Sequence, residues 1–180
     1  MRPRWNALLP YACGAMLFLL SGCALPQLLA PQKDLRSSET IGPKDGRVVL
    51  VASRSSEFKR TLVDKLAEAL LSAGMAQKTV GVGDLKEIDT SDYDMIVVIS
   101  TCLGWELDRD VESFLSGKER QANIILVTTS ASGAWVPDRG GRDFDAVSSA
   151  SKMTTLDGVV RDVIARIQSR LHHAEPKIRD

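Results

Sequence analysis

The stretch "DYDMIVVISTCLGWELDRDVESFL" (residues 92–115) decides the fold, because it places a strand, a loop and a helix in direct succession. Residues 95–100 are apolar except for Ser100 and largely β-branched, which is typical of a strand buried on both faces. Four apolar side chains beyond the loop recur at helical spacing: Leu107, Val111, Phe114 and Leu115. Acidic residues at the start of this segment, residues 106–117, suit the positive end of a helix dipole.

The same alternation of strand and helix extends outward along the chain. Further strands are expected at residues 47–53, 78–82, 123–129 and 144–150. Helices are expected at residues 57–73, ending before Gly74, and at residues 156–171. Short apolar strands that alternate with amphipathic helices are typical of a parallel sheet with helices packed on it. The sequence therefore predicts one α/β domain at residues 47–172 and a polar tail at residues 173–180.

The first 22 residues have the features of an export signal. Two arginines precede an apolar run, which small residues then close. The sequence "LSGC" (residues 20–23) resembles the lipobox of bacterial lipoproteins, which implies removal of residues 1–22 and attachment of lipid to Cys23. Ala24 after this cysteine implies the periplasmic face of the outer membrane. An ordinary signal peptide or an uncleaved anchor remains the alternative.

Composition and cysteine content limit the flexibility, the partners and the disulfides expected for the exported part of the chain. Residues 23–46 carry three prolines and no sustained period, which predicts a flexible tether with a reach on the order of 25 Å. Lys plus Arg and Asp plus Glu each total 23, so no excess of positive charge indicates nucleic acid as a partner. With the signal removed and Cys23 lipidated, Cys102 is the remaining thiol, and no internal disulfide is predicted.

The central stretch resembles the flavodoxin-like family. In that family a Tyr-Asp pair precedes the third strand, a loop with glycine and an aromatic residue follows it, and an acidic residue opens a helix that ends in Phe-Leu. The matching residues are Tyr93, Asp94, Gly104, Trp105, Glu106, Phe114 and Leu115. The resemblance covers residues 47–171 and implies a three-layer sandwich with a five-stranded parallel sheet in the order 2-1-3-4-5.

Two segments depart from the family pattern. The connection between the second and third strands has room for barely one helical turn. A glycine-rich loop at residues 130–143 stands in place of a helix.

The family resemblance implies FMN as a cofactor. In flavodoxin-like proteins the loop after the first strand holds the phosphate, and the loops after the third and fourth strands border the flavin ring. The candidate phosphate-loop residues are Ser53, Arg54, Ser55 and Ser56. The candidate residues beside the ring are Thr101, Cys102, Gly104 and Trp105.

The phosphate loop departs from the family at three positions. Ser56, Glu57 and Phe58 stand where the family usually has glycine, asparagine and threonine. Glycine lets the backbone approach a phosphate closely, whereas a nearby acid repels it. Three cations, Arg54, Lys59 and Arg60, either offset the charge of the acid or belong to a solvated helix face. A modified phosphate loop and a polar helix start that binds nothing both remain open.

Two other patterns bear on a ligand site. Residues 145–151 resemble the motif through which exported FMN-binding domains attach the cofactor covalently, with Ser151 at the attachment position. A short strand followed by a serine-rich helix entry accounts for the same residues. Trp105 and Trp135 are expected in loops at the carboxyl ends of strands, as a stacking platform, a cap on the core or a partner contact. No catalytic residue and no metal site is predicted.

These features together predict a membrane-anchored, exported flavodoxin-like lipoprotein that binds FMN for electron transfer at the cell envelope. The alternative is a cofactor-free, degenerate flavodoxin-like fold that serves as a binding or assembly lipoprotein. In both cases the expected partners are the membrane, through lipid on Cys23, and an envelope redox or assembly protein.

Overall fold

A parallel five-stranded sheet forms the centre of the structure, a computed structural model that describes residues 32–117 and 122–173. The strands are β1 (Val48–Ser53), β2 (Ala76–Gly81), β3 (Met95–Thr101), β4 (Ile124–Ser130) and β5 (Asp145–Ala150). Their order is β2-β1-β3-β4-β5, and every neighbouring pair is parallel. The predicted fold class and strand order are therefore confirmed. The predicted signal peptide and Cys23 lie outside the described residues.

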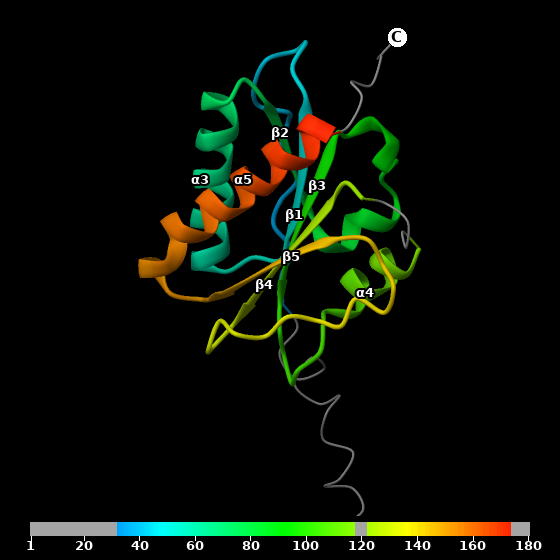
Figure 1. Cartoon of the computed structure of the whole chain (residues 1–180), viewed down its shortest axis with the longest axis vertical. Helices are drawn as coiled ribbons and strands as arrows, with labels where there is room; N and C mark the ends of the chain where they lie inside the picture. The colour runs from blue at the N-terminus through cyan, green and yellow to red at the C-terminus, as the bar shows by residue number, and fades with distance from the viewer. Residues whose placement is uncertain (1–31, 118–121, 174–180) are drawn as a thin grey trace, which may run out of the picture. The chain divides into compact units, whose positions relative to one another are not determined.

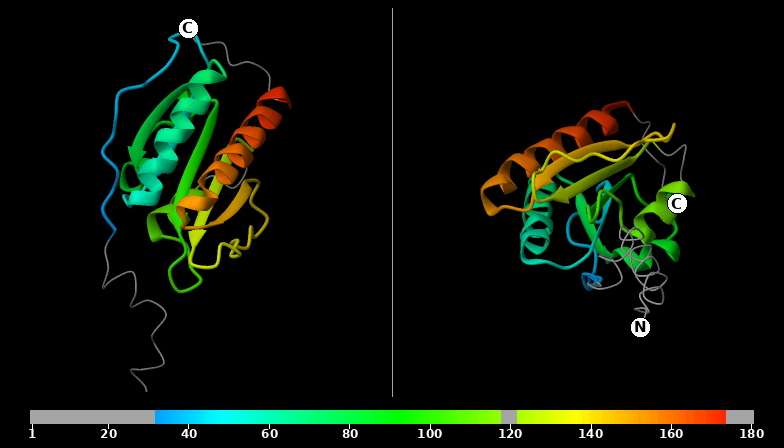
Figure 2. Two further views of the ribbon diagram at one scale, coloured as in Figure 1. Left: turned by 90° about the vertical axis from the view of Figure 1, so that its left-hand side faces the viewer. Right: turned by 90° about the horizontal axis from the view of Figure 1, so that it is seen from below.

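Helices cover the two faces of the sheet unequally. α3 (Glu57–Ser72) and α5 (Leu156–His173) lie side by side on one face, and the shorter α4 (Arg109–Ser116) lies on the other (Figures 1 and 2). Two short 3-10 helices, η1 (Val82–Lys86) and η2 (Thr90–Asp92), fill the connection between β2 and β3. Residues 131–144, between β4 and β5, contain no helix. Both predicted departures from the family pattern are present.

α4 begins later than its sequence pattern predicts. The predicted helix includes residues 106–117, whereas the structure places Asp108 at the N-cap, where its side chain accepts a hydrogen bond from the Asp110 N-H. Leu103 and Glu106 instead close a tight turn with two reciprocal backbone hydrogen bonds of 3.3 Å. The turn takes the chain out of helical geometry before the cap.

The alternation of side chains along each strand produces two apolar cores. Val49, Val51 and Val97 face α3 and α5, whereas Leu50 and Val98 face α4 and the loop after β4. All five of these side chains are fully buried. The continuous apolar strand sequences follow from this arrangement, since both sheet faces are covered. No helix in residues 32–117 and 122–173 combines the length and the apolar character needed to cross a bilayer.

Residues 32–41 form an extended segment, here called the strap, along the outer edge of β2 (Figure 2, left). Ile41 and Gln77 exchange backbone hydrogen bonds of 2.9 and 2.8 Å, and the Ser38 N-H donates to the Thr79 carbonyl at 3.0 Å. The prediction of a flexible tether over residues 23–46 is therefore corrected for the strap. The physical reason is that an edge strand presents unpaired backbone groups, which the strap satisfies.

Candidate functional site

The carboxyl ends of β1 and β3 define the candidate site. The two strands are neighbours, with Ser53 of β1 opposite Ile99 of β3. The chain leaves β1 toward α3 on one face of the sheet and leaves β3 toward α4 on the other. A crevice at such a switch point is where open α/β sheets bind ligands. Residues 54–56 follow β1 and residues 102–108 follow β3, so both loops leave the sheet at this switch point.

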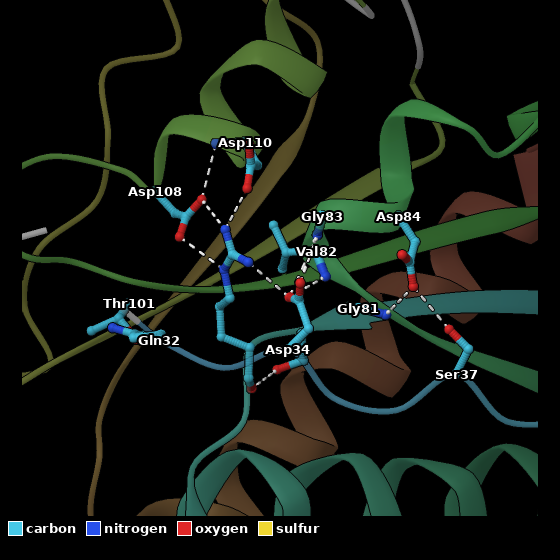
Figure 3. A network of polar contacts seen from close by, with 12 residues as sticks. Gln32, Asp34, Ser37, Gly81, Val82, Gly83, Asp84, Thr101, Asp108 and Asp110 are labelled. Atoms are coloured by element: carbon cyan, nitrogen blue, oxygen red, sulfur yellow. Dashed lines mark hydrogen bonds and ion pairs between the residues drawn. The ribbon is translucent and has the colours of Figure 1, made fainter. Parts of the chain in front are cut away.

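Arg54 is the charged centre of this crevice. Its guanidinium makes a two-pronged pair with Asp108, with both N–O distances 3.0 Å, and its Nη1 lies 2.9 Å from Asp34 Oδ1. Nη2 also pairs with Asp110. Figure 3 shows the carboxylates of Asp34, Asp108 and Asp110 converging at this point. One cation thus joins the end of β1, the strap and the start of α4.

Burial and pairing shift the pKa values of this cluster. Burial by itself lowers the pKa of Arg54, but the hydrogen bonds with Asp108 and Asp110 outweigh burial and raise it. For Asp108, burial favours the neutral acid, yet the hydrogen bond and charge of Arg54 hold the pKa of its carboxyl below the ordinary value. The Arg54–Asp108 pair is therefore ionised at neutral pH, and Asp34 and Asp110 place two further carboxyl groups against the same guanidinium.

The strap bonds to Arg54 and to residues on both sides of it. Gln32 Oε1 accepts hydrogen bonds from Lys59 Nζ at 3.0 Å and from Thr101 Oγ1 at 3.1 Å. The Ser55 N-H donates to the Lys33 carbonyl, and the Leu35 N-H donates to the Ser53 carbonyl. The strap therefore bonds to the loop after β1 and, through Gln32, to the end of β3.

Lys59 is buried beneath Gln32, with 2% of its surface exposed. The sequence allowed a solvated position on the face of α3, and this interpretation is wrong for Lys59, whereas Arg60 is exposed. Burial lowers the pKa of Lys59 to about 8, although the negative charge of Asp108 partly opposes this effect. A lysine with a perturbed pKa at the ligand-binding edge of a sheet is a feature of functional sites.

The predicted phosphate-loop residues lie together, but the fold already uses their polar groups. Ser53 Oγ donates to the Arg54 carbonyl, and Ser56 Oγ accepts from the Lys59 N-H as the N-cap of α3. Ser55 Oγ accepts from Arg60. Arg54 is committed to its three carboxylates.

An FMN phosphate does not fit this arrangement. The Ser55 N-H is already used by the strap, and the guanidinium that could neutralise a phosphate is surrounded by carboxylates. Glu57 adds a further exposed acid in the first turn of α3. A dianion at this point would meet net negative charge and few available donors.

The predicted ring-side residues lie on the loop after β3. Cys102 donates its N-H to the Thr129 carbonyl at 2.8 Å, and its thiol is half-buried. Burial raises the pKa of this thiol, although hydrogen bonds to the backbone oppose the shift, so Cys102 is a neutral thiol at pH 7. Thr101 is the ring-side candidate that contacts the strap.

Gly104 and Trp105 occupy the tip of the tight turn that follows Cys102. Their φ angles are 65° and 66°, so both central residues are in the left-handed region, which suits glycine but not a bulky side chain. Such a conformation costs a non-glycine residue about 1–2 kcal/mol. The turn nevertheless holds the Trp105 side chain in solvent, where 75% of its surface is exposed. Strain that displays an aromatic side chain is a signal of function rather than of packing.

The remaining sequence candidates have structural roles. Trp135 is half-buried and packs against the core beneath α4, in agreement with the hypothesis that it caps the core. At the motif that resembles a covalent flavin site, Ser148 Oγ donates to the Trp135 carbonyl and Ser149 Oγ to the Ala150 carbonyl. Ser151 is exposed. Residues 32–117 and 122–173 contain no cluster of three or more His, Cys, Asp or Glu suited to a metal ion.

Sequence reasoning missed several members of the site. Gln32 and Asp34 lie in a segment without periodicity, and no local signal distinguished them from a linker. Asp108 and Asp110 were assigned to a helix dipole, but they also bind the arginine at the end of the neighbouring strand. An arginine after one strand and paired acids after the adjacent one could have indicated this contact.

Comparison with known proteins identifies the fold. No protein-family model matches the sequence, and no curated protein matches it. A flavodiiron core from Synechocystis sp. aligns with 72% of this chain at 14% identity and a TM-score of 0.53, and the chain spans 37% of that protein. A short-chain flavodoxin associated with a bacterial microcompartment aligns with 69% of this chain and 99% of its own length, at 7% identity and a TM-score of 0.51.

A third solved structure extends the same likeness. An oxidoreductase from Corynebacterium diphtheriae aligns with 72% of this chain and 99% of its own length, at 12% identity and a TM-score of 0.51. At identities this low, similarity is evidence of fold and not of activity. This chain has a flavodoxin-like fold.

Proposed function

We propose that this chain is an exported, lipid-anchored protein whose flavodoxin-like domain serves as a binding or assembly module of the cell envelope, without a bound flavin. The observation that carries the proposal is the contact of Gln32 with Lys59 and Thr101. Through this contact the chain itself fills the crevice where a flavodoxin-like protein would hold a phosphate. Trp105, in the turn that follows β3, remains exposed and offers an aromatic contact to a protein partner.

The proposed location rests on the lipobox resemblance at residues 20–23. Acyl chains on Cys23 would contribute about 0.8 kcal/mol per buried methylene group, which is sufficient for stable anchoring when two or more chains are present. Ala24 supports the periplasmic face of the outer membrane as the destination.

Replacing the proposed lipidation site should abolish both attachment and processing. In Cys23→Ser, incorporation of a labelled fatty acid is expected to disappear and the uncleaved precursor to accumulate, because the thiol that receives the lipid is missing. Both changes are read from the same gel. Cys13→Ser, within the apolar run of the signal, is the matched control and should be labelled normally. Normal labelling of Cys23→Ser would contradict the anchor.

Electron transfer with bound FMN is the second candidate function. It is favoured by the exposed Trp105 on the loop that borders the flavin ring in flavodoxin-like proteins. It requires that the strap leave the crevice and that Arg54 be released from its carboxylates. A flavin would then supply the redox chemistry, and the chain would provide its position and surroundings.

Titration with FMN discriminates between the two functions. The full chain, purified in detergent, is expected to be colourless and to leave the fluorescence of added FMN unchanged, because the phosphate position is closed. A known apoflavodoxin under the same conditions provides the positive control. Saturable quenching of the FMN fluorescence would overturn the cofactor-free function and support electron transfer.

Crosslinking in cells tests whether a partner protein contacts Trp105. A photoreactive amino acid at position 105 is expected to capture an envelope protein, because Trp105 is displayed at the ligand-binding edge. The matched position is Leu71, which is 52% exposed near the C-terminal end of α3, at the end of the sheet where the strands begin. Equal products from both positions, or none from position 105, would contradict a partner at the Trp105 turn.

A further inference from the structure

The strap is attached to the domain mainly through polar contacts. Most of its residues are exposed, including Ile41 at 55%, and Leu35 is the strap side chain that packs partly against the core under α3 and α5. Its polar contacts include backbone hydrogen bonds to β1, to the loop after β1 and to β2, and hydrogen bonds of the Gln32 amide, the Asp34 carboxylate and the Ser37 hydroxyl. Elements with little buried apolar surface belong to the part of a protein that opens without global unfolding.

Asp34 fastens the strap near its N-terminal end. Its Oδ1 accepts hydrogen bonds from Arg54 and, at 2.9 Å, from the Val82 N-H at the start of η1. The adjacent Ser37 hydroxyl donates to Asp84 Oδ2 at 2.9 Å, and this carboxylate also accepts from the Gly81 N-H. These contacts are visible in Figure 3. The strap is therefore held at defined points.

Glycines at the end of β2 and in η1 leave room for these contacts. A Cβ at Gly81 would lie 2.8 Å from Asp34 Cβ, and one at Gly83 would lie 2.9 Å from Asp34 Oδ2. The φ of Gly81 is −71°, which any residue can adopt, so its own backbone does not require glycine. The close approach of Asp34 does. The edge is thus shaped to receive the strap.

The strap covers Lys59, a charged group that is buried, and it contacts Thr101, which is half-buried. Gln32 lies over Lys59 and Thr101 at the ligand-binding edge, and Lys59 is held there with a pKa lowered to about 8. Burying an ammonium group costs stability unless it is paired and hydrogen-bonded, and here the Gln32 amide oxygen accepts a hydrogen bond from Lys59 Nζ. Lys59 is costly to bury, and the strap that covers it is held mainly by polar contacts. A local opening of the strap would therefore expose Lys59 without unfolding the domain.

We propose that the strap is a latch, fastened by Asp34, whose local opening controls access to Lys59 and Thr101 at the carboxyl edge of the sheet. The latch regulates the site of the proposed function. It rests on the proposed function in one respect, because it takes the carboxyl ends of the strands as the binding surface. The strap directly follows the segment that leads from the proposed anchor at Cys23, so the same chain segment joins the membrane attachment to the site.

Gly81→Ala in the full chain tests the latch. The added methyl group would occupy the space of Asp34, so the strap should leave while the sheet stays folded. Acetylation of Lys59 by a water-soluble active ester, followed by mass spectrometry, is expected to become at least about tenfold faster than in the wild type, as for a site released from a protected state. Gly158→Ala in α5 is the matched control, since its Cβ would meet nothing within 4 Å.

Hydrogen exchange separates local opening from global unfolding. In Gly81→Ala, hydrogen exchange should be faster at the strap amides that donate to β1 and β2, namely those of Leu35, Ser38 and Ile41. Exchange at the amides of β3 should not become faster. Asp34→Ala provides a second variant, which removes the fastening without steric pressure. Unchanged Lys59 labelling in both variants would overturn the latch, and so would equal acceleration in β3. The labelling needs no partner, so a failed crosslinking experiment leaves this result intact.

Discussion

Arg54→Ala is expected to lower the free energy of unfolding by about 2–4 kcal/mol. The substitution leaves Asp108, whose side chain is 21% exposed, without its two-pronged partner. It also leaves three carboxylates close together with no cation between them. Removing one member of a largely buried pair is costly because the remaining charge stays desolvated, and the partial exposure of the cluster reduces the upper end of the range. Chemical denaturation at pH 7 measures the effect.

Two further variants control for the loss of an arginine. Arg60→Ala removes an exposed arginine that donates to Ser55 Oγ, and it should change the free energy of unfolding by less than about 0.5 kcal/mol. Asp108→Asn combined with Arg54→Ala should recover part of the lost stability, because it also removes the stranded charge. A loss below about 1 kcal/mol in Arg54→Ala would show that the cluster is solvated and does not hold the site together.

Stability should rise by about 3 kcal/mol between pH 8 and pH 10.5 through the titration of Lys59. Burial lowers the pKa of this lysine from 10.5 to about 8 in the folded protein. Between these two values the unfolded chain binds the proton and the folded chain does not, so raising the pH favours folding. Below pH 8 both states hold the proton, and the folded state carries the cost of a buried ammonium group.

The contribution of Lys59 is obtained as a difference between proteins. Burial raises the pKa of both Cys102 and Tyr93, which reduces stability as the pH rises, but this effect is common to wild type and Lys59→Met. The free energy of unfolding, measured from pH 7 to pH 10.5, should rise more steeply in the wild type than in Lys59→Met. Lys152→Met, at an exposed lysine, should follow the wild type. Parallel curves for wild type and Lys59→Met would refute a neutral, buried Lys59 at high pH.

The effects expected for Arg54 and for Lys59 both concern the strap. Arg54 fastens the strap through Asp34, and Lys59 lies beneath it through Gln32. At neutral pH the first contact stabilises the closed crevice, whereas the buried ammonium group of the second opposes it. A cover that is held on one side and disfavoured on the other is suited to opening, which agrees with the proposed latch.

The sequence was sufficient for the sheet and its helices. Val48 to Ser53 and Met95 to Thr101 read as buried strands because both faces of the sheet are covered, so nearly every position is apolar. The stripe on α3 and the stop before Gly74, whose φ is 72°, located that helix. Strand order followed from the family resemblance and from the alternation of strands and helices.

The candidate site was predictable only in part. The loops after β1 and β3 were placed correctly at neighbouring ends of the sheet, since parallel topology alone brings them together. The chemistry of these loops was not predictable, because it depends on which side chains of other segments enter the crevice. Lys59 has the sequence pattern of an exposed helix residue, yet it is buried by Gln32 from a segment 27 residues earlier.

The amino-acid sequence by itself determined the α/β class, the strands and the two long helices, because the period of apolar residues directly records which faces are buried. The tertiary structure alone decided that residues 32–41 dock on the edge of β2, that Gln32 joins Lys59 to Thr101, and that Arg54 collects three carboxylates. These contacts join single polar residues as far as 69 positions apart. Isolated polar contacts leave no periodic pattern, so only the folded arrangement reveals them.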